Sequence, residues 1–436
     1  MTLGSLFDGA GGFPLAALSA HLPSACGQVD ITPIWGSEVE PFPILVTSKN
    51  IPQMQHLGDI TKINGAKIAP VEIITGGSPC QDLSNAGQRA GLREGNRSVL
   101  FFEMIRIIKE MREATNGKYP TYIVWENVPG ALSSNRGEDF RVILEEFCRI
   151  KEPTTTIPRP KKWNRAGQIL GGDFSIAWRI LNAKYFGVPQ SRRRIFLVAD
   201  FRGESAPKIL FKPTGLSWHF EPSRTPREET SASSARCTNS TIRTAAGFTG
   251  GVSAKINLAY SEELSPALKA TQNVHVLENH ATDARIKIRE DGIVPTLTSS
   301  MGTGGNKQPL IQTIFPQKVG TLCYNDYKGL SLQDTNKMLV QNNQTIRRLT
   351  PLECARLQGF PDYWTKNLET PNPTAAEITK WQNIFAGVGK IKSESQVRTW
   401  LKNPYSDSAA YKMWGNSVAV PCVEYILQNI RKESEK

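Results

Sequence analysis

Short apolar runs, separated by longer amphipathic stretches, organise the first part of the sequence. Apolar runs of strand length predict buried strands of a parallel sheet, and apolar residues at helical spacing predict helices packed on that sheet. The predicted strands lie at residues 3–7, 34–37, 57–60, 71–75 and 122–125, and the predicted helices lie at 13–20 and 99–111. This alternation of strands and helices predicts an α/β domain.

The pattern changes between residues 151 and 200. The segment 151–172 is rich in Pro, Lys and Arg, and we expect it to be an extended surface insertion. The apolar runs 176–181 and 194–199 then predict a pair of edge strands.

From about residue 201 to 345 the chain is rich in Ser, Thr, Gly, Asn and Gln, with few helical patterns. Three similar segments each predict an irregular hairpin. They pair residues 265–268 with 276–277, 294–297 with 310–312, and 319–322 with 339–341. The polar loops of these hairpins suit hydrogen bonding to base edges, but ordinary loop-rich β structure would have the same composition.

Helical patterning returns near the C-terminus. Thr350 is a predicted N-cap, with Pro351 at the first helical position, Glu353 completing a capping box and Gly359 ending the helix. Residues 371–404 predict a polar, partly helical connection. The stretch 415–418 leads into an apolar helix at 420–430, which we expect to close the sheet beside the glycine-rich loop near the N-terminus.

The chain has 436 residues, 39% of them hydrophobic, and a formal net charge of +12. This length accommodates a large core and a smaller domain, and the positive charge favours a polyanionic partner. No apolar run is long enough to span a membrane, and the N-terminus leads into a strand without a signal peptide. Seven scattered cysteines without a CxxC pair predict a cytoplasmic protein with reduced thiols, no disulfide and no metal site.

The stretch 76–81, Gly-Gly-Ser-Pro-Cys-Gln, places Cys80 in a loop directly after the predicted strand 71–75. Open α/β sheets hold their sites at the carboxyl ends of strands, so Cys80 is a candidate nucleophile. A buried structural thiol is the alternative for a cysteine taken alone. The following segment, 82–97, is polar and rich in Gly and Arg, a composition typical of a loop that contacts an anionic partner.

Other polar groups follow neighbouring strands. The glycine-rich turn 8–12, then Glu38 and then Asp59 suggest a nucleoside-type cofactor lying across the sheet, because a carboxylate can accept hydrogen bonds from ribose hydroxyls. The glycine spacing is not GxGxxG, which weakens the alternative of a nicotinamide oxidoreductase. Glu126 also follows a strand, so adjacent strands are expected to bring it and Cys80 over one pocket.

Taken together, these motifs resemble the cytosine-C5 DNA methyltransferase family. The matching residues, in the family's order, are Phe7-Asp8-Gly9-Ala10-Gly11-Gly12, Glu38, Gly58-Asp59-Ile60, Gly77-Ser78-Pro79-Cys80-Gln81, Glu126-Asn127-Val128, Gln190-Ser191-Arg192-Arg193-Arg194, the helical segment 348–361, and Gly415-Asn416-Ser417-Val418. The resemblance implies a Rossmann-like, S-adenosylmethionine-dependent methyltransferase domain at 1–200, completed by 405–436. Residues 201–404 would then form a smaller, irregular β-rich target-recognition domain and a hinge.

The resemblance also implies a mechanism. Cys80 would attack C6 of a cytosine, because C5 alone is a poor nucleophile and a thiolate is a strong one. Glu126, protonated or sharing a proton, would bond to N3 and the exocyclic amine. Arg192 and Arg194 would hold the base O2, a phosphate or Glu126, although the three consecutive arginines 192–194 could also form a solvated basic turn.

The methyl donor would be S-adenosyl-L-methionine, leaving S-adenosyl-L-homocysteine, with no metal required. The resemblance assigns the donor's contacts to Phe7, Asp8, Gly9, Ala10, Gly11, Gly12, Glu38, Asp59, Ile60, Pro79, Leu100, Asn416, Ser417 and Val418. Val39 departs from the family, in which an aromatic residue often follows the acid, so the contact with the sulfonium is expected to differ.

The substrate implied by the resemblance is double-stranded DNA, from which the cytosine must be flipped out. We expect the loop after Cys80 to contact the DNA backbone through Gln81, Ser84, Arg89, Arg93 and Arg97. The chain is then a monomeric modification enzyme of a restriction–modification system or a mobile element, with a cognate restriction endonuclease as a candidate partner. A tRNA cytosine-C5 methyltransferase and a non-catalytic DNA-binding protein with the same fold are the alternatives.

Overall fold

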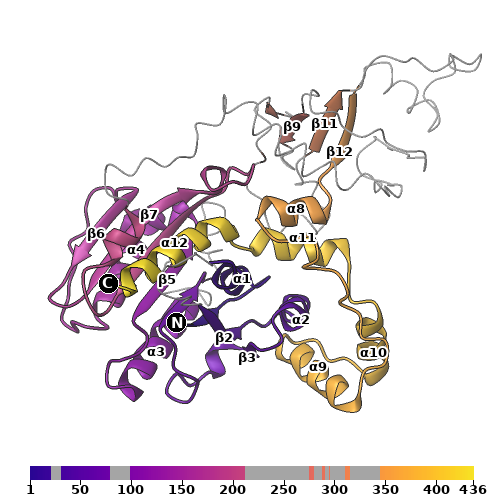
Figure 1. Cartoon of the computed structure of the whole chain (residues 1–436), viewed down its shortest axis with the longest axis horizontal. Helices are drawn as coiled ribbons and strands as arrows, with labels where there is room; N and C mark the ends of the chain where they lie inside the picture. The colour runs from indigo at the N-terminus through magenta and orange to yellow at the C-terminus, as the bar shows by residue number, and fades with distance from the viewer. Residues whose placement is uncertain are drawn as a thin grey trace, which may run out of the picture.

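The computed structural model describes residues 1–20, 31–78, 99–211, 294 and 349–436, together with the main chain of four strands between 274 and 348. Its centre is an eight-stranded sheet with the order β3-β2-β1-β4-β5-β8-β7-β6 (Figure 1). The strands are β1 (Thr2–Leu6), β2 (Thr32–Ser37), β3 (Gln55–His56), β4 (Ile73–Gly76), β5 (Tyr122–Asn127), β6 (Ala166–Leu170), β7 (Ser175–Asn182) and β8 (Arg193–Asp200).

The first five strands are parallel, and β8, β7 and β6 are antiparallel additions beyond β5. The chain runs outward from β1 through β2 to β3, and then returns to place β4 on the other side of β1. The carboxyl ends of β1 and β4 therefore form a topological switch point, where open α/β sheets bind their ligands.

Side chains of successive strand residues enter two separate cores, one on each face of the sheet. Ile73 and Val124 belong to one core, whereas Ile74 and Trp125 belong to the other. Helices α1 (Gly12–Ser19), α2 (Pro41–Asn50), α5 (Ala206–Leu210) and α12 (Val420–Ser434) contribute to the first core, and α3 (Val99–Ala114) and α4 (Glu138–Cys148) contribute to the second. The sheet is thus covered on both faces, as the apolar runs of its parallel strands require.

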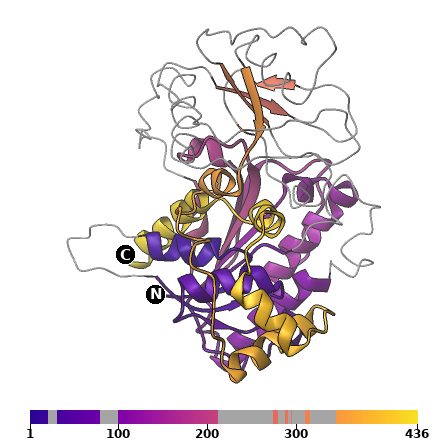
Figure 2. The same ribbon diagram turned by 90° about the vertical axis from the view of Figure 1, so that its right-hand side faces the viewer.

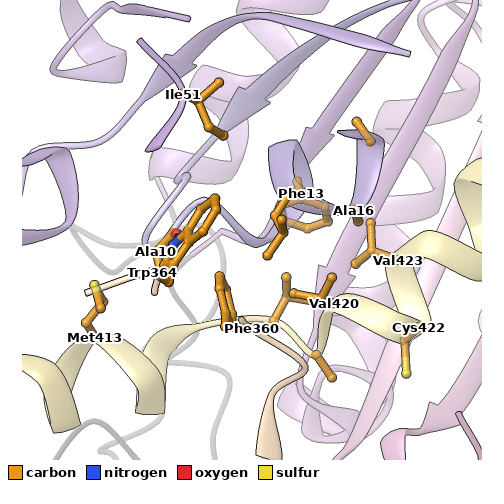
Figure 3. Packing of buried hydrophobic residues seen from close by; sticks show 14 of the residues in the cluster. Ala10, Phe13, Ala16, Ile51, Phe360, Trp364, Met413, Val420, Cys422 and Val423 are labelled. Atoms are coloured by element: carbon orange, nitrogen blue, oxygen red, sulfur yellow. Dashed lines mark hydrogen bonds between the residues drawn. The ribbon is translucent and has the colours of Figure 1, made fainter. Parts of the chain in front are cut away.

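The C-terminal helices pack against the first residues of the chain. They are α8 (Pro351–Leu357), α9 (Ala375–Gly387), α10 (Glu394–Lys402), α11 (Asp407–Asn416) and α12. Trp364 donates a hydrogen bond to the Ala10 carbonyl at 2.8 Å, and its ring lies beside Phe360, which faces Phe13 across the core (Figure 3). In the turned view of Figure 2 the yellow C-terminal helices lie against the indigo N-terminal ones. This packing closes the domain around the loop after β1.

A second sheet has the order β10-β9-β11-β12 and is entirely antiparallel (Figure 1). Its strands are β9 (Val274–Glu278), β10 (Lys287–Arg289), β11 (Leu310–Ile314) and β12 (Gln344–Arg348). Strand β12 runs directly into α8, which joins the small sheet to the large domain. Val294 also bonds to the segment before β8, through Ser191 N–H to its carbonyl at 2.8 Å.

The α/β fold with an additional β-rich unit is confirmed. The capping box of Thr350 and Glu353 is also confirmed, and Gly359 ends the turn with a φ of 83°. Helix α12 does lie beside the glycine-rich loop, since α1 and α12 pack together. Helix α4 is absent from the predicted elements, although its apolar residues have helical spacing, as the burial of Phe140, Ile143, Leu144 and Phe147 shows.

The predicted pairing of 176–181 with 194–199 is confirmed by β7 and β8, but two other predictions about strands are wrong. Strands β7 and β8 are internal, and the edge strand on this side of the sheet is β6, which lies within the segment expected to be only a surface insertion. Residues 276–277 in β9 pair with β10 and β11, and residues 310–312 in β11 pair with β9 and β12, so neither pairs with its predicted hairpin partner. Residues 265–268, 295–297 and 319–341 lie outside the described residues.

Candidate active site

The loop between β1 and α1 is built from backbone conformations that favour glycine. Gly9 has a φ of 55° and Gly11 one of 79°, values that L side chains rarely adopt. A Cβ at Gly11 would lie 2.7 Å from the Thr47 methyl group, whereas beside Gly9 the nearest atom is 4.0 Å away. The loop is therefore packed tightly on one side and open beside Gly9, where a ligand can approach the main chain.

Glu38 connects this loop to the end of β2. One carboxylate oxygen accepts a hydrogen bond from Gly9 N–H at 2.8 Å, and the other accepts from the N–H groups of Val39 at 2.7 Å and Glu40 at 2.9 Å. Burial raises the pKa of Glu38, and these three hydrogen bonds act in the opposite direction. The carboxylate is thus fixed at the strand tip, while the neighbouring Val39 side chain is 40% exposed.

The side chains of Asp8 and Ala10 point into the protein. Asp8 is only 4% exposed, and its Oδ1 accepts a hydrogen bond from the Ser5 hydroxyl at 2.7 Å. Burial raises the pKa of Asp8 to about 8, with the Ser5 hydrogen bond lowering it and the charge of Glu38 raising it further. Ala10 is fully buried and its carbonyl accepts from Trp364. Only the main chain of these two residues can meet a ligand.

Asp59 and Ile60 follow β3, which ends at His56, so the strand predicted at 57–60 is wrong. Asp59 Oδ1 accepts hydrogen bonds from the N–H and the hydroxyl of Thr61, at 3.0 and 2.9 Å, and so caps the short helix η1 (Ile60–Lys62). Ile60 is 4% exposed and belongs to the same core as the partly buried Phe7 and Leu100. These apolar groups therefore come from three neighbouring segments of one face of the sheet.

Residues before α12 form the opposite wall of the loop. A Cβ at Gly12 would lie 2.6 Å from Val418 Cγ1 and 3.5 Å from Ser417 Oγ. Ser417 and Val418 are buried, whereas Asn416 is exposed at the end of α11. Gly12 is therefore required by the close approach of a segment some 400 residues away along the chain.

Glu126 and Arg194 form an ion pair at the end of β5. Arg194 Nε lies 3.1 Å from Glu126 Oε1, and both side chains are largely buried, with 14% and 13% of their surface exposed. A Cβ at Gly77 would lie 3.0 Å from Glu126 Oε2, so the carboxylate lies directly over the main chain that leads to Cys80. The antiparallel pairing of β5 with β8 makes this contact, because it sets the end of one strand beside the start of the other.

Arg192, two residues earlier in the same segment, is directed at the residues before α12. It is 3% exposed, and its Nη2 donates to the carbonyls of Ser417 at 2.5 Å and Gly415 at 3.3 Å. Burial lowers its pKa, and the charge of Arg194 lowers it further. Arg192 thus joins β8 to the segment that walls the glycine-rich loop.

Ser78 is the last described residue before the candidate nucleophile. It is 5% exposed, and its hydroxyl accepts a hydrogen bond from Trp125 Nε1 at 3.3 Å. Pro79, Cys80, Gln81, Ser84, Arg89, Arg93 and Arg97 lie outside the described residues. Sequence reasoning gave Ser78 and Ser5 no role of their own; the available signals were the position of Ser78 within the glycine-rich stretch 76–81 and that of Ser5 in the strand before the turn 8–12.

The three described cysteines, Cys148, Cys354 and Cys422, are buried and free. Burial raises the pKa of each of these thiols, which makes them poor nucleophiles. Over the described ranges, no group of three His, Cys, Asp or Glu residues is arranged to hold a metal ion. Nor does that part of the chain contain a helix with the length and apolar character needed to cross a membrane.

A family model described as C-5 cytosine-specific DNA methylase matches residues 1–151 and 163–378. The DNA N-6-adenine-methyltransferase of Escherichia phage P1 is 29% identical over 421 residues, which cover 83% of this chain and 52% of the relative. The type II methyltransferase M1.ScrFI of Lactococcus lactis subsp. cremoris is 25% identical over 371 residues, covering 84% of this chain and 63% of the relative. The chain thus spans between half and two thirds of these two proteins.

Among solved structures, the S. pombe Dnmt2 methyltransferase superposes with a TM-score of 0.51 at 16% identity, covering the whole of both chains. This similarity supports the Rossmann-like methyltransferase fold. The family model covers most of the sequence, including every described strand of the large sheet. The chain therefore belongs to the C-5 cytosine-specific DNA methylase family.

Proposed function

We propose that this chain is a DNA cytosine-C5 methyltransferase that uses S-adenosyl-L-methionine. The observation that carries the proposal is the Glu126–Arg194 pair held over Gly77, at the sheet edge that also carries the glycine-rich loop and Glu38. At this end of the sheet the Glu126–Arg194 pair can bind a nucleobase, and Glu38 can bind the ribose of a nucleoside. Cys80 follows Gly77 by three residues in the sequence.

The residues around Gly9 fit S-adenosyl-L-methionine. Glu38 is fixed by three main-chain N–H groups, which leaves one of its roughly four lone-pair sites, on Oε2, to accept from a ribose hydroxyl. Ile60 and Phe7 supply apolar surface for an adenine, and the open side of Gly9 admits the amino-acid part. When bound, the sulfonium supplies an electrophilic methyl group.

For the base, Glu126 and Arg194 have complementary tasks. A Glu126 oxygen accepts a hydrogen bond from the cytosine amine and shares a proton with N3, while the Arg194 guanidinium holds the carboxylate in place and stabilises negative charge on O2. These contacts lower the cost of placing electrons on the ring while the Cys80 thiolate adds to C6.

The covalent step is balanced as follows. The Cys80 sulfur forms a bond to C6, the C5–C6 double bond opens, and C5 takes the methyl group. A base then removes the C5 proton, and the C–S bond breaks to restore the double bond and the thiolate. Adenine N6 needs no such adduct because the amine is itself a nucleophile, so the cysteine motif favours cytosine despite the name of the phage P1 relative.

We further propose a role in a restriction–modification system or a mobile element, because one relative is named a type II methyltransferase and another comes from a phage. The substrate is then duplex DNA, and a cognate endonuclease is a candidate partner. The loop residues Gln81, Ser84, Arg89, Arg93 and Arg97 remain our proposed backbone contacts, with the chain acting as a monomer.

The test is methyl transfer from labelled S-adenosyl-L-methionine into duplex DNA and into tRNA, followed by nucleoside analysis. We expect 5-methylcytosine in DNA, and Cys80→Ser should abolish it while thermal stabilisation by the cofactor is retained. Label in N6-methyladenine or in tRNA would overturn the proposed substrate. If 5-fluorocytosine DNA traps no covalent complex, the alternative of a non-catalytic DNA-binding protein gains support.

A further inference from the structure

The segment before β6 exposes several cations. The start of β6 lies at the same end of the sheet as the carboxyl ends of the parallel strands, where the candidate active site lies. We define the basic platform as Arg136, Arg159, Lys161, Lys162 and Arg165, all of which are exposed. The family model matches residues up to 151 and again from 163, so three of these five cations lie in a segment without a counterpart in the family. The reaction proposed above gives this segment no task.

The strand register fixes where the platform lies. Glu126 pairs with Phe196, Phe196 with Arg179, and Arg179 with Ala166, so one row across the sheet joins the active-site acid to the first residue of β6. The Arg165 carbonyl extends the ladder one residue further by accepting from Ile180 N–H at 2.9 Å. With strands about 4.8 Å apart, three steps separate β6 from β5 by about 14 Å.

The platform is held rigidly by buried aromatic residues. Trp163 is 8% exposed, and its Nε1 donates to the Gly137 carbonyl at 2.7 Å. Its ring centroid lies 5.2 Å from that of Phe140 and 6.0 Å from that of Trp178. Trp178 Nε1 in turn donates to the Asn164 carbonyl at 3.2 Å. Core contacts of this kind fix the main chain between Lys162 and Arg165.

Two more bonds fix the segment before Trp163. Ile157 N–H donates to the buried Glu145 carboxylate at 2.9 Å, and Arg159 Nη1 donates to the Arg136 carbonyl at 3.1 Å. The second bond ties the insertion to the turn that carries Arg136. Together with the Trp163–Gly137 bond, these contacts hold the main chain of residues 157–165 beside the turn at 136–137, whereas a basic run in a solvated loop would have no such anchors.

The charge of the platform is barely balanced. Its acidic neighbour Glu138 lies 4.0 Å from Arg159 but only 2.5 Å from Arg141, which lies outside the platform. Glu145 is buried and paired with Arg141 and Arg149. Within the described part of the chain, the five cations of this anchored segment and turn have one ion-pair partner, Glu138, which they share with Arg141, and such an excess of positive charge complements a regular polyanion.

We propose that the basic platform binds the phosphate backbone of the DNA duplex that flanks the target cytosine. The inference rests on the proposed function. The separation of about 14 Å corresponds to about four base-pair steps of 3.4 Å, so a duplex whose flipped base is at Glu126 carries phosphates within reach of β6. The insertion thereby lengthens the DNA contact without touching the target base.

The variant Lys161→Gln/Lys162→Gln tests the proposal, because neither lysine side chain takes part in the bonds that anchor the segment. The matched control is Lys118→Gln/Lys432→Gln, which removes two exposed lysines at the opposite edge. Lys118 precedes β5, and Lys432 lies in the last turn of α12, where Ser434 contacts Met1. Both pairs lose the same charge.

Binding of the full chain to a random-sequence 40-base-pair duplex would be measured between 50 and 200 mM salt. Each phosphate contact contributes about 0.9 to the slope of log K against log salt, so the platform variant should lower the slope by about 2 and the control should leave it unchanged. Equal slopes for wild type and both variants would overturn the platform proposal alone.

The methylation readout separates this proposal from the proposed function. The platform variant should keep its kcat for cytosine methylation at saturating DNA and raise KM, because only duplex binding has changed. Absence of duplex binding by the wild type, together with transfer to tRNA, would overturn both proposals. A kcat that falls with an unchanged salt slope would also contradict the platform proposal. Little change in thermal unfolding is expected for either variant, because all four lysines are exposed and the contact that the control loses, Lys118 Nζ at 5.0 Å from the Tyr119 ring centroid, is a weak one at an exposed site.

Discussion

The buried acid under the glycine-rich loop should make the stability of this protein depend on pH. Asp8 Oδ1 accepts from Ser5, and within the described part of the chain Oδ2 has no hydrogen-bond partner. The carboxyl therefore gains little from ionising, and its pKa rises from 3.8 to about 8. Asp8→Asn replaces the protonated acid by a group of the same shape that does not titrate.

The sign of the effect follows from proton counting. Between about pH 4 and pH 8 the folded chain keeps a proton on Asp8 that the unfolded chain has released, so the free energy of unfolding of the wild type falls as pH rises. Each pH unit within this window costs about 1.4 kcal/mol. Between pH 5 and 9 the Asn variant should therefore gain about 4 kcal/mol relative to the wild type, most of it below pH 8.

Chemical denaturation of both proteins at one-unit pH intervals would measure this difference. Taking the difference cancels the titration of groups that do not interact with Asp8, whereas Glu38, whose charge acts on Asp8, leaves a smaller remaining contribution. Ser5→Ala removes the hydrogen bond that lowers the Asp8 pKa, so it should extend the sloping region to higher pH. A difference between Asp8→Asn and wild type that stays constant from pH 5 to 9 would refute the claim that Asp8 holds its proton in the folded state.

Three further substitutions test the packing around the site. Arg192→Met leaves two main-chain carbonyls without their buried donor, so we expect a loss of about 2–5 kcal/mol of stability in denaturation, and weaker cofactor binding by calorimetry. Gly12→Ala would bring a Cβ to 2.6 Å from Val418, and should weaken cofactor binding at least tenfold in the same assay while leaving DNA affinity unchanged. Gly77→Ala would press a methyl group against Glu126 at 3.0 Å, and should lower kcat in the methylation assay with little change in melting temperature.

Local chemistry made part of this molecule predictable from the sequence. The helix at Thr350 has its start encoded by a capping box and its end by Gly359, all within ten residues, so no distant contact was needed to find it. Glu38 and Glu126 could be expected at strand tips because apolar runs end just before them. Parallel strands then bring their carboxyl ends to one edge of the sheet, which makes a shared site a reasonable prediction.

Long-range pairing was not predictable. Val276 and Leu277 are apolar residues typical of a strand, but their neighbours in the sequence do not indicate that β10 and β11 lie on their two sides. Arg192 and Arg194 are only two residues apart in the sequence. Arg194 nevertheless pairs with Glu126, whereas Arg192 is buried and donates to main-chain carbonyls more than 200 residues away. The orientation of the Arg192 side chain depends on where the C-terminal segment packs. The residues next to Arg192 in the sequence do not indicate where that segment lies.

The antiparallel direction of the last three strands explains how the site and the basic platform come to share an edge. In a parallel sheet, the start of β8 would lie at the edge opposite Glu126, and Arg194 would not reach it. The direction of β6 follows the same rule, because β6 runs antiparallel to β7. Residues inserted before β6 therefore lie at the end of the sheet that carries the candidate active site. Residues of the turn between β6 and β7, including Asp173, lie at the opposite end. An insertion at that turn would have carried its cations away from the proposed path of the duplex. The cations lie before Ala166, the place from which the sheet can present them to the duplex.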